Sequence, residues 1–291
     1  MEKEQSLTVA ERIRRQFEGL TRAERQLANA MMENYPVSAL GSITAVAEVS
    51  HVSTPTVARM ARKLGFGGFP DLQAALRDEL KAKISNPITK HERWAENAPD
   101  THILNRFADA AMSNMHQTLR QIDLDAFNDV TTLLCDKQRA VHTVGGRITR
   151  ALADYFFTHM QMIRDDVTLI ADNSNTWPHY IMSLKPGDVL VAFDIRRYER
   201  DFMRLAEMAN ERNVELVLFT DQWGSPAAKY ASHTFHARIE APSAWDSNVV
   251  ILFIIEAVIA AVQTAAWEET ESRMRNLEDL FDQMRLFRKF T

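Results

Sequence analysis

The stretch LKPGDVLVAFDIRRYERD (residues 184–201) joins a turn, a short apolar run and a cluster of charged residues. Pro186 and Gly187 are turn residues, and the apolar run at 188–193 has the length and composition of a buried β-strand. The sequence becomes strongly charged where this strand would end, with Asp194, Arg196 and Arg197 close together. This stretch therefore raises two questions: which sheet contains the strand, and what the charged residues bind.

Apolar runs alternate with helical patterns on both sides of this strand. Helices are expected between the strands at 148–163, 177–184, 200–212 and 225–231, and a long buried helix at 246–266. The strands are expected at 138–144, 167–171, 188–193, 214–220 and 233–239. This alternation predicts an α/β doubly wound domain, in which helices cover both faces of a parallel sheet. In such folds ligands bind at the carboxyl ends of the strands, where helix N-termini point.

The first 80 residues, in contrast, show helical periodicity and almost no strand-like alternation. Val9, Ile13 and Phe17 are four residues apart, which places them on one face of a helix. Thr21 and Glu24 have the spacing of a capping box at the start of a second helix, which is expected to run to about residue 34. A third short helix is expected at 44–50. This part of the chain is therefore predicted to be an all-α domain.

A fourth helix is expected within HVSTPTVARMARKL (51–64), with Ser53 as its N-cap. Its apolar residues face inward, and Thr54, Thr56, Arg59, Arg62 and Lys63 are left outside. Two short helices joined by a tight turn, the second basic on its outer face, form a helix-turn-helix pattern that is typical of DNA binding. The alternative is an ordinary helical subdomain with a solvated basic face.

The segment SITAVAEVSHVSTPTVARMARKLGFGGFPDLQAAL (42–76) resembles the helix-turn-helix segment of RpiR-type bacterial transcriptional regulators. This resemblance implies an operator of double-stranded DNA as the partner of the domain. The candidate DNA-binding residues are Ser53, Thr54, Thr56, Arg59, Arg62 and Lys63. The local charge agrees, because residues 51–69 contain three basic residues and no acidic one in a chain whose net charge is −5.

The same family has a sugar isomerase (SIS) domain after its helix-turn-helix domain, and the resemblance extends over about residues 126–266. It rests on the glycine turn at 145–146, on LKPGDVLVAF and on VLFTDQWGSPAAKYA. The resemblance implies that this domain binds a small-molecule effector, in the family usually a phosphorylated sugar. The whole chain then divides into a helix-turn-helix domain at 1–84, a linker and connecting helix at 85–125, an SIS-like domain at 126–268 and a C-terminal helix at 269–291.

Two loops differ from the family pattern at the expected ligand site. The usual G-x-G-x-S turn is replaced by residues 145–149, in which Arg147 occupies the second glycine position and Thr149 stands in for the serine. The usual S-x-S-G-x-T loop is replaced by residues 194–199, which include Asp194 and Glu199. A carboxylate beside a phosphate costs roughly 4 kcal/mol for each charge pair, at ~4 Å and an effective dielectric constant of ~20.

Three interpretations of the charged stretch remain open. Its arginines could bind an anionic effector, its acids could pair with those arginines and close the pocket, or the stretch could lie in a subunit interface. Asp246 and Ser247 could add polar groups to the same pocket, or could simply cap the long helix. The candidate effector-binding residues are Gly145, Gly146, Arg147, Thr149, Arg196, Arg197, Tyr198, Asp246 and Ser247.

An apolar stripe on the helix expected at 101–122 and a second one at 274–284 could help build a homo-oligomer, a dimer or tetramer, although the first stripe could equally pack within the fold. The single cysteine, Cys135, is expected to be a packed thiol. No signal peptide or membrane-spanning segment is expected, so the protein is expected to be cytoplasmic.

No cofactor or metal site is predicted, because the GGRITR turn lacks the dinucleotide fingerprint and the histidines lack metal-ligand spacing. We expect a DNA-binding regulator and not an enzyme. One alternative is a sugar-phosphate isomerase with a helical appendage, but the loop that should grip its substrate is missing. Another is an oligomerisation module that does not bind DNA. The basic helix at 54–64 argues against both.

Overall fold

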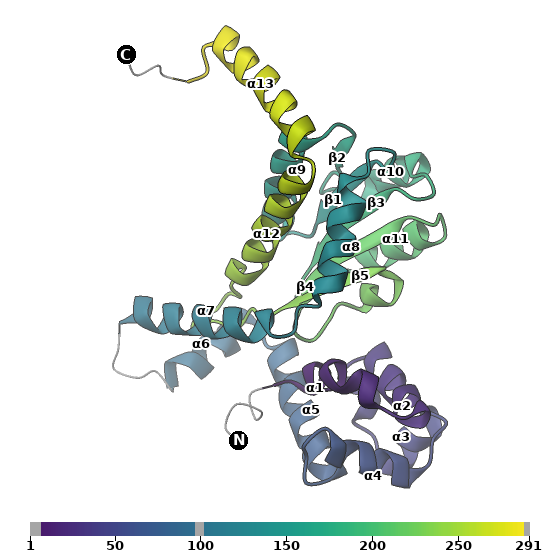
Figure 1. Ribbon diagram of the computed structural model, residues 1–291. Coiled ribbons are helices and arrows are strands. Elements are labelled where there is room, and N and C mark those ends of the chain that lie inside the picture. The colour runs from purple at the N-terminus through teal and green to yellow at the C-terminus, as the bar shows by residue number, and fades with distance from the viewer. Residues whose placement is uncertain (1–6, 97–101, 288–291) are drawn as a thin grey trace. The chain divides into compact units, whose positions relative to one another are not determined.

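The computed structural model describes residues 7–96 and 102–287, which fall into two compact units (Figure 1). The first unit contains the chain up to Gln121, together with Asp221–Lys229 and His236–Val250. The second contains Ile122–Thr220, Tyr230–Phe235 and the chain from Ile251 onward. The units are therefore not two successive halves of the sequence.

The N-terminal part of the first unit consists of five helices with short connections (Figure 1). The helices are α1 (Val9–Gln16), α2 (Arg22–Glu33), α3 (Ile43–Val49), α4 (Thr54–Lys63) and α5 (Phe69–Ile84). The predicted capping box of Thr21 and Glu24 is present, and Thr8 and Glu11 form a second one at the start of α1. The all-α prediction for this part is confirmed, and α5 is an additional helix that was not predicted.

Two further helices complete the helical part of the first unit, α6 (Pro87–Glu96) and α7 (Ile103–Leu119). The segment interpreted as a linker thus contains a helix, and its residues 97–100 lie outside the described residues. Lys90 on α6 is only 3% exposed, and its ammonium group lies 2.6 Å from an Asp246 carboxylate oxygen. Helix α7 buries Asn114 and Thr118. Its predicted apolar stripe is partly covered: Leu104 and Leu119 are exposed, and Phe107, Ala111, Met115 and Ile122 are half-buried.

The sheet has five strands in the order β2-β1-β3-β4-β5. They are β1 (Val141–Gly145), β2 (Val167–Leu169), β3 (Val189–Asp194), β4 (Glu215–Asp221) and β5 (His233–Ala237). The pairs β1–β2, β1–β3 and β3–β4 are parallel. This strand order is one of the two common doubly wound arrangements, whose ligand crevice lies where the order reverses, between β1 and β3. The predicted α/β fold class is confirmed.

Helices cover this sheet as the alternating pattern predicts (Figure 1). They are α8 (Leu124–Cys135), α9 (Arg150–Ile163), α10 (Trp177–Ser183), α11 (Arg200–Asn210) and α12 (Val249–Ala265). A further helix, α13 (Trp267–Met284), follows α12, contacts α9 and extends away from the sheet (Figure 1). Phe193 of β3 stacks on Phe219 of β4, and Phe156 of α9 meets Phe193 edge to face. Three details differ from expectation. Helix α8 was not predicted, and α12 begins at Val249, three residues later than the expected start at 246. The helix expected at 225–231 is a 3₁₀ helix at Pro226–Tyr230.

No single helix in residues 7–96 and 102–287 is long and apolar enough to cross a membrane. Helices α12 and α13 pass the length and composition test only together, as a pair bent by 100°.

Candidate functional site

Helices α3 and α4 form the predicted helix-turn-helix pair in the first unit. Ser42 caps α3, its hydroxyl accepting a hydrogen bond from the backbone N–H of Ala45 at 3.1 Å. The turn that follows is closed by the N–H of Val52, which donates to the carbonyl oxygen of Ala47 at 2.9 Å, and His51 adopts a positive φ of 50°. This tight turn packs the two short helices against each other, with the outer face of α4 at the surface.

Four of the six candidate DNA-binding residues are exposed. Ser53, Arg59, Arg62 and Lys63 are exposed and Thr54 is half-buried. Thr56 was expected to be outside, and this is wrong: it is buried because it lies four residues before the core residue Met60, on the same helix face. Its hydroxyl is 2.9 Å from the Ser53 hydroxyl and accepts from the Arg59 guanidinium at 3.4 Å.

Two of these residues also have partners inside the helical part. Ser53 stands at the N-cap position of α4, but its hydroxyl bonds to Thr56 and caps no backbone N–H. The ammonium group of Lys63 donates to the carbonyl oxygen of Gly19 at 2.6 Å and pairs with the buried Glu24 carboxylate at 3.0 Å. Lys63 is therefore held toward α2, while Arg59 and Arg62 lie on the exposed face of α4.

The first candidate effector loop is the turn after β1 in the second unit. The hydroxyl of Thr149 accepts from the N–H of Gly146 at 2.8 Å and donates to the carbonyl oxygen of Phe193 at 2.6 Å. Thr149 therefore ties the turn after β1 to the end of β3. A side chain at Gly145 would collide with this turn, because its Cβ would lie 2.4 Å from the carbonyl oxygen of Thr149.

The second loop follows β3 and lies against the first. Glu199, at the N-cap position of α11, accepts a hydrogen bond from the backbone N–H of Arg147 at 3.3 Å. The same carboxylate oxygen would be 3.1 Å from a Cβ placed on Gly146, so it covers this glycine. Arg196 adopts a left-handed conformation with φ of 63°, which is uncommon for a side chain of its size. A carboxylate of the chain itself thus occupies the turn where the family pattern has an anion-binding loop.

The structure brings together Gly145, Gly146, Arg147 and Thr149 with the charged loop. Arg147 and Arg197 are exposed, and Arg196 and Tyr198 are half-buried. Asp246 and Ser247 belong to the other unit, where Asp246 pairs with Lys90. Helix α12 begins at Val249, and the Ser247 hydroxyl accepts a hydrogen bond from the Val249 N–H at 3.4 Å.

Two domain families match this chain. A helix-turn-helix domain of the rpiR family matches residues 7–83, and an SIS domain matches residues 134–261. The chain belongs to the RpiR type of helix-turn-helix transcriptional regulators.

Relatives and solved structures agree with this RpiR-type assignment. The transcriptional regulator HexR of Escherichia coli is 24% identical over 230 residues, covering 78% of this chain and 76% of HexR. NanR of Vibrio vulnificus, solved in complex with ManNAc-6P, has a TM-score of 0.57 at 17% identity, covering 97% of this chain and 100% of that one. The sugar isomerase domain of an RpiR transcription factor from Sphaerobacter thermophilus has a TM-score of 0.56 at 23% identity, covering 60% and 97%. These two structures establish the fold.

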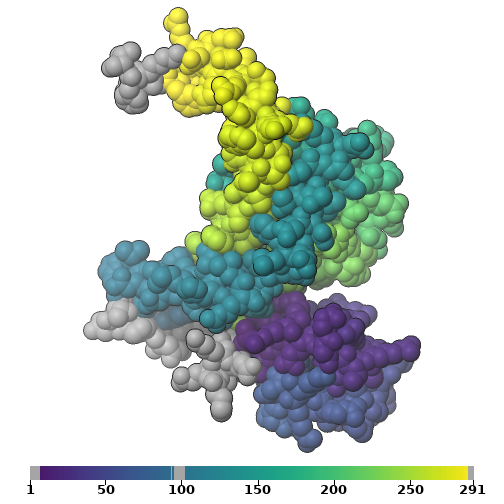
Figure 2. Space-filling model, in the orientation of Figure 1, coloured from purple at the N-terminus to yellow at the C-terminus, as the bar shows by residue number. Residues whose placement is uncertain are grey.

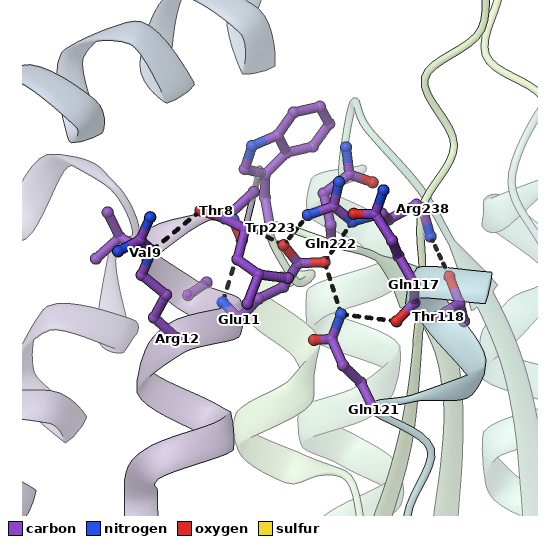
Figure 3. Close-up of polar contacts among 12 residues, drawn as sticks. Thr8, Val9, Glu11, Arg12, Gln117, Thr118, Gln121, Gln222, Trp223 and Arg238 are labelled. Carbon is purple, nitrogen blue, oxygen red and sulfur yellow. Dashed lines mark hydrogen bonds and ion pairs between the residues drawn. The ribbon is translucent and has the colours of Figure 1, made fainter. Parts of the chain in front are cut away.

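One polar cluster was not anticipated from the sequence of this RpiR-type chain. Glu11 on α1 forms a buried ion pair with Arg238, which follows β5 (Figure 3). The two residues are 227 positions apart, so no spacing pattern connects them. The available signal was weak, since a single acidic residue in the first turn of a helix is most simply explained by its capping box.

Proposed function

We propose that this RpiR-type regulator binds operator DNA through α4 and that a small effector bound in its SIS domain controls this binding. The observation that supports the DNA-binding role most directly is the exposure of Arg59 and Arg62 on the outer face of α4, the helix that follows the tight turn after α3. In helix-turn-helix proteins the start of the second helix reaches base edges in the major groove, and basic side chains contact phosphates.

Each candidate residue of α4 then has a distinct role. Ser53, Thr54 and Arg59 are placed to reach base edges, because they lie in the first two turns of the helix and are exposed or half-buried. Arg62 and Lys63 lie in the last turn, where cations suit phosphate contacts. Lys63 would have to exchange its contacts with Gly19 and Glu24 for a phosphate. Thr56 orients Ser53 and Arg59 and does not touch DNA.

The effector is proposed to be a small anion, derived from a sugar or carrying a carboxylate. The turns after β1 and β3 contain Arg147, Arg196, Arg197 and Tyr198. Arginine recognises carboxylate and phosphate groups through paired N–H donors. Glu199 already accepts the N–H of Arg147, so a phosphate at that backbone group would meet a carboxylate. The anionic group of the effector therefore binds to the arginine side chains and not to the backbone of the turn.

The comparison with NanR bears on the class of effector. That protein was solved with ManNAc-6P, a sugar phosphate. For this chain we infer a sugar-derived acid or sugar phosphate that enters the same SIS fold but is held differently, because Glu199 occupies the β1 turn. No catalytic role is assigned, and an isomerase of sugar phosphates remains the competing proposal, since SIS domains also occur in isomerases.

A homo-oligomer, a dimer or tetramer, is part of the same proposal. The side chains of Leu104 and Met112 on α7 are 67% and 56% exposed, and Leu280 and Met284 on α13 are 50% and 67% exposed. Figure 2 shows that α13, in yellow, displays much of its surface. Exposed apolar side chains gathered on one helix are typical of association surfaces. A regulator that binds chromosomal DNA would act in the cytoplasm.

Two measurements test the two parts of the proposal. Duplexes that bind the full-length chain are selected from a random DNA pool, and a panel of hexose phosphates, hexuronic acids and sugar acids is screened by thermal shift. We expect a selected half-site motif, and an acid that raises the melting temperature and changes affinity for the selected duplex. Failure to enrich any motif would overturn the DNA-binding role. Turnover of a sugar phosphate by the chain would favour the isomerase.

A further inference from the structure

The buried carboxylate of Glu11 lies at the centre of a hydrogen-bond cluster on α1 (Figure 3). Nε of Arg238 donates to Oε1 of Glu11 at 2.7 Å, and Nη2 of Arg238 donates to Oε2. The carboxylate also accepts from the Gln121 amide at 3.0 Å and from the backbone N–H of Thr8 at 2.7 Å. The Glu11 side chain, 2% exposed, is therefore satisfied on both oxygens by partners from three segments of the chain.

Arg238 belongs to the SIS domain by sequence, yet it is part of the first compact unit. Its backbone N–H donates to the Thr118 hydroxyl of α7 at 3.0 Å. The neighbouring loop makes a second contact with α1, since the Arg14 guanidinium donates to the carbonyl oxygen of Gln222 at 2.8 Å. Two segments of the SIS domain, 221–229 and 236–250, are thus packed with the helix-turn-helix domain into one body.

Arg12, the residue after Glu11, connects this cluster to the C-terminal end of helix α4. Arg12 donates from Nη1 to the carbonyl oxygen of Leu64, the C-cap of α4, at 2.9 Å. Its guanidinium also lies over the Phe66 ring, 4.5 Å from the centroid. Arg12 therefore fixes the end of α4 to α1, while Glu11, one residue before it, fixes α1 to Arg238.

The buried ion pair of Glu11 and Arg238 is expected to be either fully formed or fully broken. Separating a buried ion pair leaves an uncompensated charge in a low-dielectric site, which is costly. Burial by itself would raise the pKa of Glu11, but the hydrogen bonds and charge of Arg238, with Gln121 and the Thr8 N–H, lower that pKa below its usual value. The carboxylate thus stays charged and tied to Arg238, and a shift of segment 236–250 has to be followed by α1.

We propose that Glu11 and Arg12 are positioning residues that connect segment 236–250 of the SIS domain to the end of α4. Through this connection the state of the SIS domain sets how α4 is presented to DNA. The proposal goes beyond the proposed function and rests on it, because that function requires two domains but does not say which residues transmit a change between them. Coupling of this kind is reciprocal, so DNA bound to α4 also has to affect segment 236–250.

The first arm of the test uses hydrogen exchange of the full-length chain without DNA. Arg238→Met should speed exchange of the Leu64–Phe66 amides about 10-fold or more, because it removes the cation that pairs with Glu11. A double variant, Glu11→Leu with Arg238→Met, replaces the pair by apolar side chains in case the single variant unfolds. Protected amides in β1 and β3 report that the fold is intact, and Arg15→Met, an exposed arginine on α1, is the matched control. Unchanged exchange at 64–66 in a folded variant overturns the connection.

The second arm adds a duplex selected by the wild-type chain. In the wild type it should slow exchange at 221–229 and 236–250, and Arg12→Met should abolish that response while Arg15→Met retains it. A wild-type chain that binds the duplex without any response at 236–250 overturns the proposal, and so does an Arg12→Met chain with the full response. If no duplex can be selected, the DNA-binding function itself fails, and the first arm still decides whether the two segments are connected.

Discussion

The backbone N–H of Arg147 donates to the Glu199 carboxylate at 3.3 Å, so an acidic side chain of the protein occupies a turn that would otherwise offer its amide to a ligand. In the usual SIS pattern small hydroxyl residues leave such backbone groups open, forming an anion-binding concavity. Here the carboxylate belongs to the chain itself. In the proposed effector site, anions are consequently disfavoured at this one position and not over the whole surface.

Replacement of Glu199 by Ala should therefore create phosphate binding. Removing the carboxylate frees the Arg147 N–H and eliminates a repulsive charge. Inorganic phosphate and hexose 6-phosphates should therefore bind at least about 10-fold more tightly, a gain in binding free energy of about 1.4 kcal/mol. Isothermal titration of the wild type and the variant measures the difference. Glu211→Ala, which removes an exposed acid at the other end of α11, is the control. Equal affinities for wild type and Glu199→Ala would contradict this role.

Replacement of Arg59 by Ala should weaken binding to the selected duplex by ~1–3 kcal/mol, because an arginine that contacts a guanine through two hydrogen bonds contributes about that much. A gel-shift titration at fixed salt measures the change, and a base-by-base scan should show relaxed preference at one position. Arg77→Ala on α5, also exposed, should have little effect. Unchanged affinity would exclude Arg59 from the interface.

Thr56→Val should separate stability from recognition. The variant keeps the buried volume but loses the hydroxyl that contacts Ser53 and Arg59, which should lower the free energy of unfolding by about 1 kcal/mol. Its effect on DNA affinity should be smaller than that of Arg59→Ala. Urea unfolding and the same gel-shift titration give the two numbers. A loss of affinity as large as that of Arg59→Ala would mean that Thr56 itself reaches the DNA.

A buried carboxylate on α5 should make stability depend on pH near neutrality. Burial raises the pKa of Glu79 to about 7, although its hydrogen bonds from Tyr35 and the Val9 N–H act in the opposite direction. The folded state therefore holds the proton more tightly than the unfolded state. The resulting stabilisation is fully present below pH 4.5 and is lost as the pH rises through 7.

Urea unfolding at several pH values should show this loss, on the order of 2 kcal/mol between pH 5 and 8, as the difference between wild type and Glu79→Gln. The difference is needed because His236 acts oppositely: burial and the nearby Arg14 hold its pKa well below 6.5, so its contribution rises with pH up to that value. Asp78→Asn, an exposed neighbour, should leave the pH dependence as in the wild type. A Glu79→Gln profile parallel to that of the wild type would refute the assignment.

Asp246→Asn should lower stability without affecting the effector. Lys90 is buried against this carboxylate, and removing one charge of a buried pair costs on the order of 3 kcal/mol. The double variant Lys90→Met with Asp246→Asn should recover much of that loss. Thermal shift by the effector, relative to each variant's own melting temperature, should stay unchanged. If the effector no longer raised the melting temperature of a folded Asp246→Asn chain, Asp246 would have to be assigned to effector binding.

Local patterns predicted the folded elements well and their contacts poorly. The strand at 188–193 and the capping box of Thr21 are set by neighbouring residues, so they could be recognised from sequence. Helix α8 was missed because LDAFNDVTTLLC mixes β-branched residues with a short apolar run, which does not distinguish helix from strand. Thr56 was placed outside because it is polar, although its spacing from Met60 pointed inward.

The long-range ion pairs could not be predicted at all. Lys90 and Asp246 are 156 positions apart, and each lies in a segment where a charged residue is ordinarily solvated. Only the folded chain shows that the two charges neutralise each other. The role of Asp246 was accordingly predicted from its nearest visible feature, the start of a long helix, whereas the partner that the fold supplies to its carboxylate is Lys90.

The interleaving of the two units along the chain limits how this regulator can be recombined with its relatives. A chimera that joined the first 121 residues to the SIS domain of another regulator would bring a foreign side chain to the position of Arg238. Glu11 would then be buried without its cation. A hybrid protein therefore cannot be made simply by joining the two domains between the helix-turn-helix match and the SIS match. A viable hybrid has to inherit α1 and segment 236–250 from the same parent.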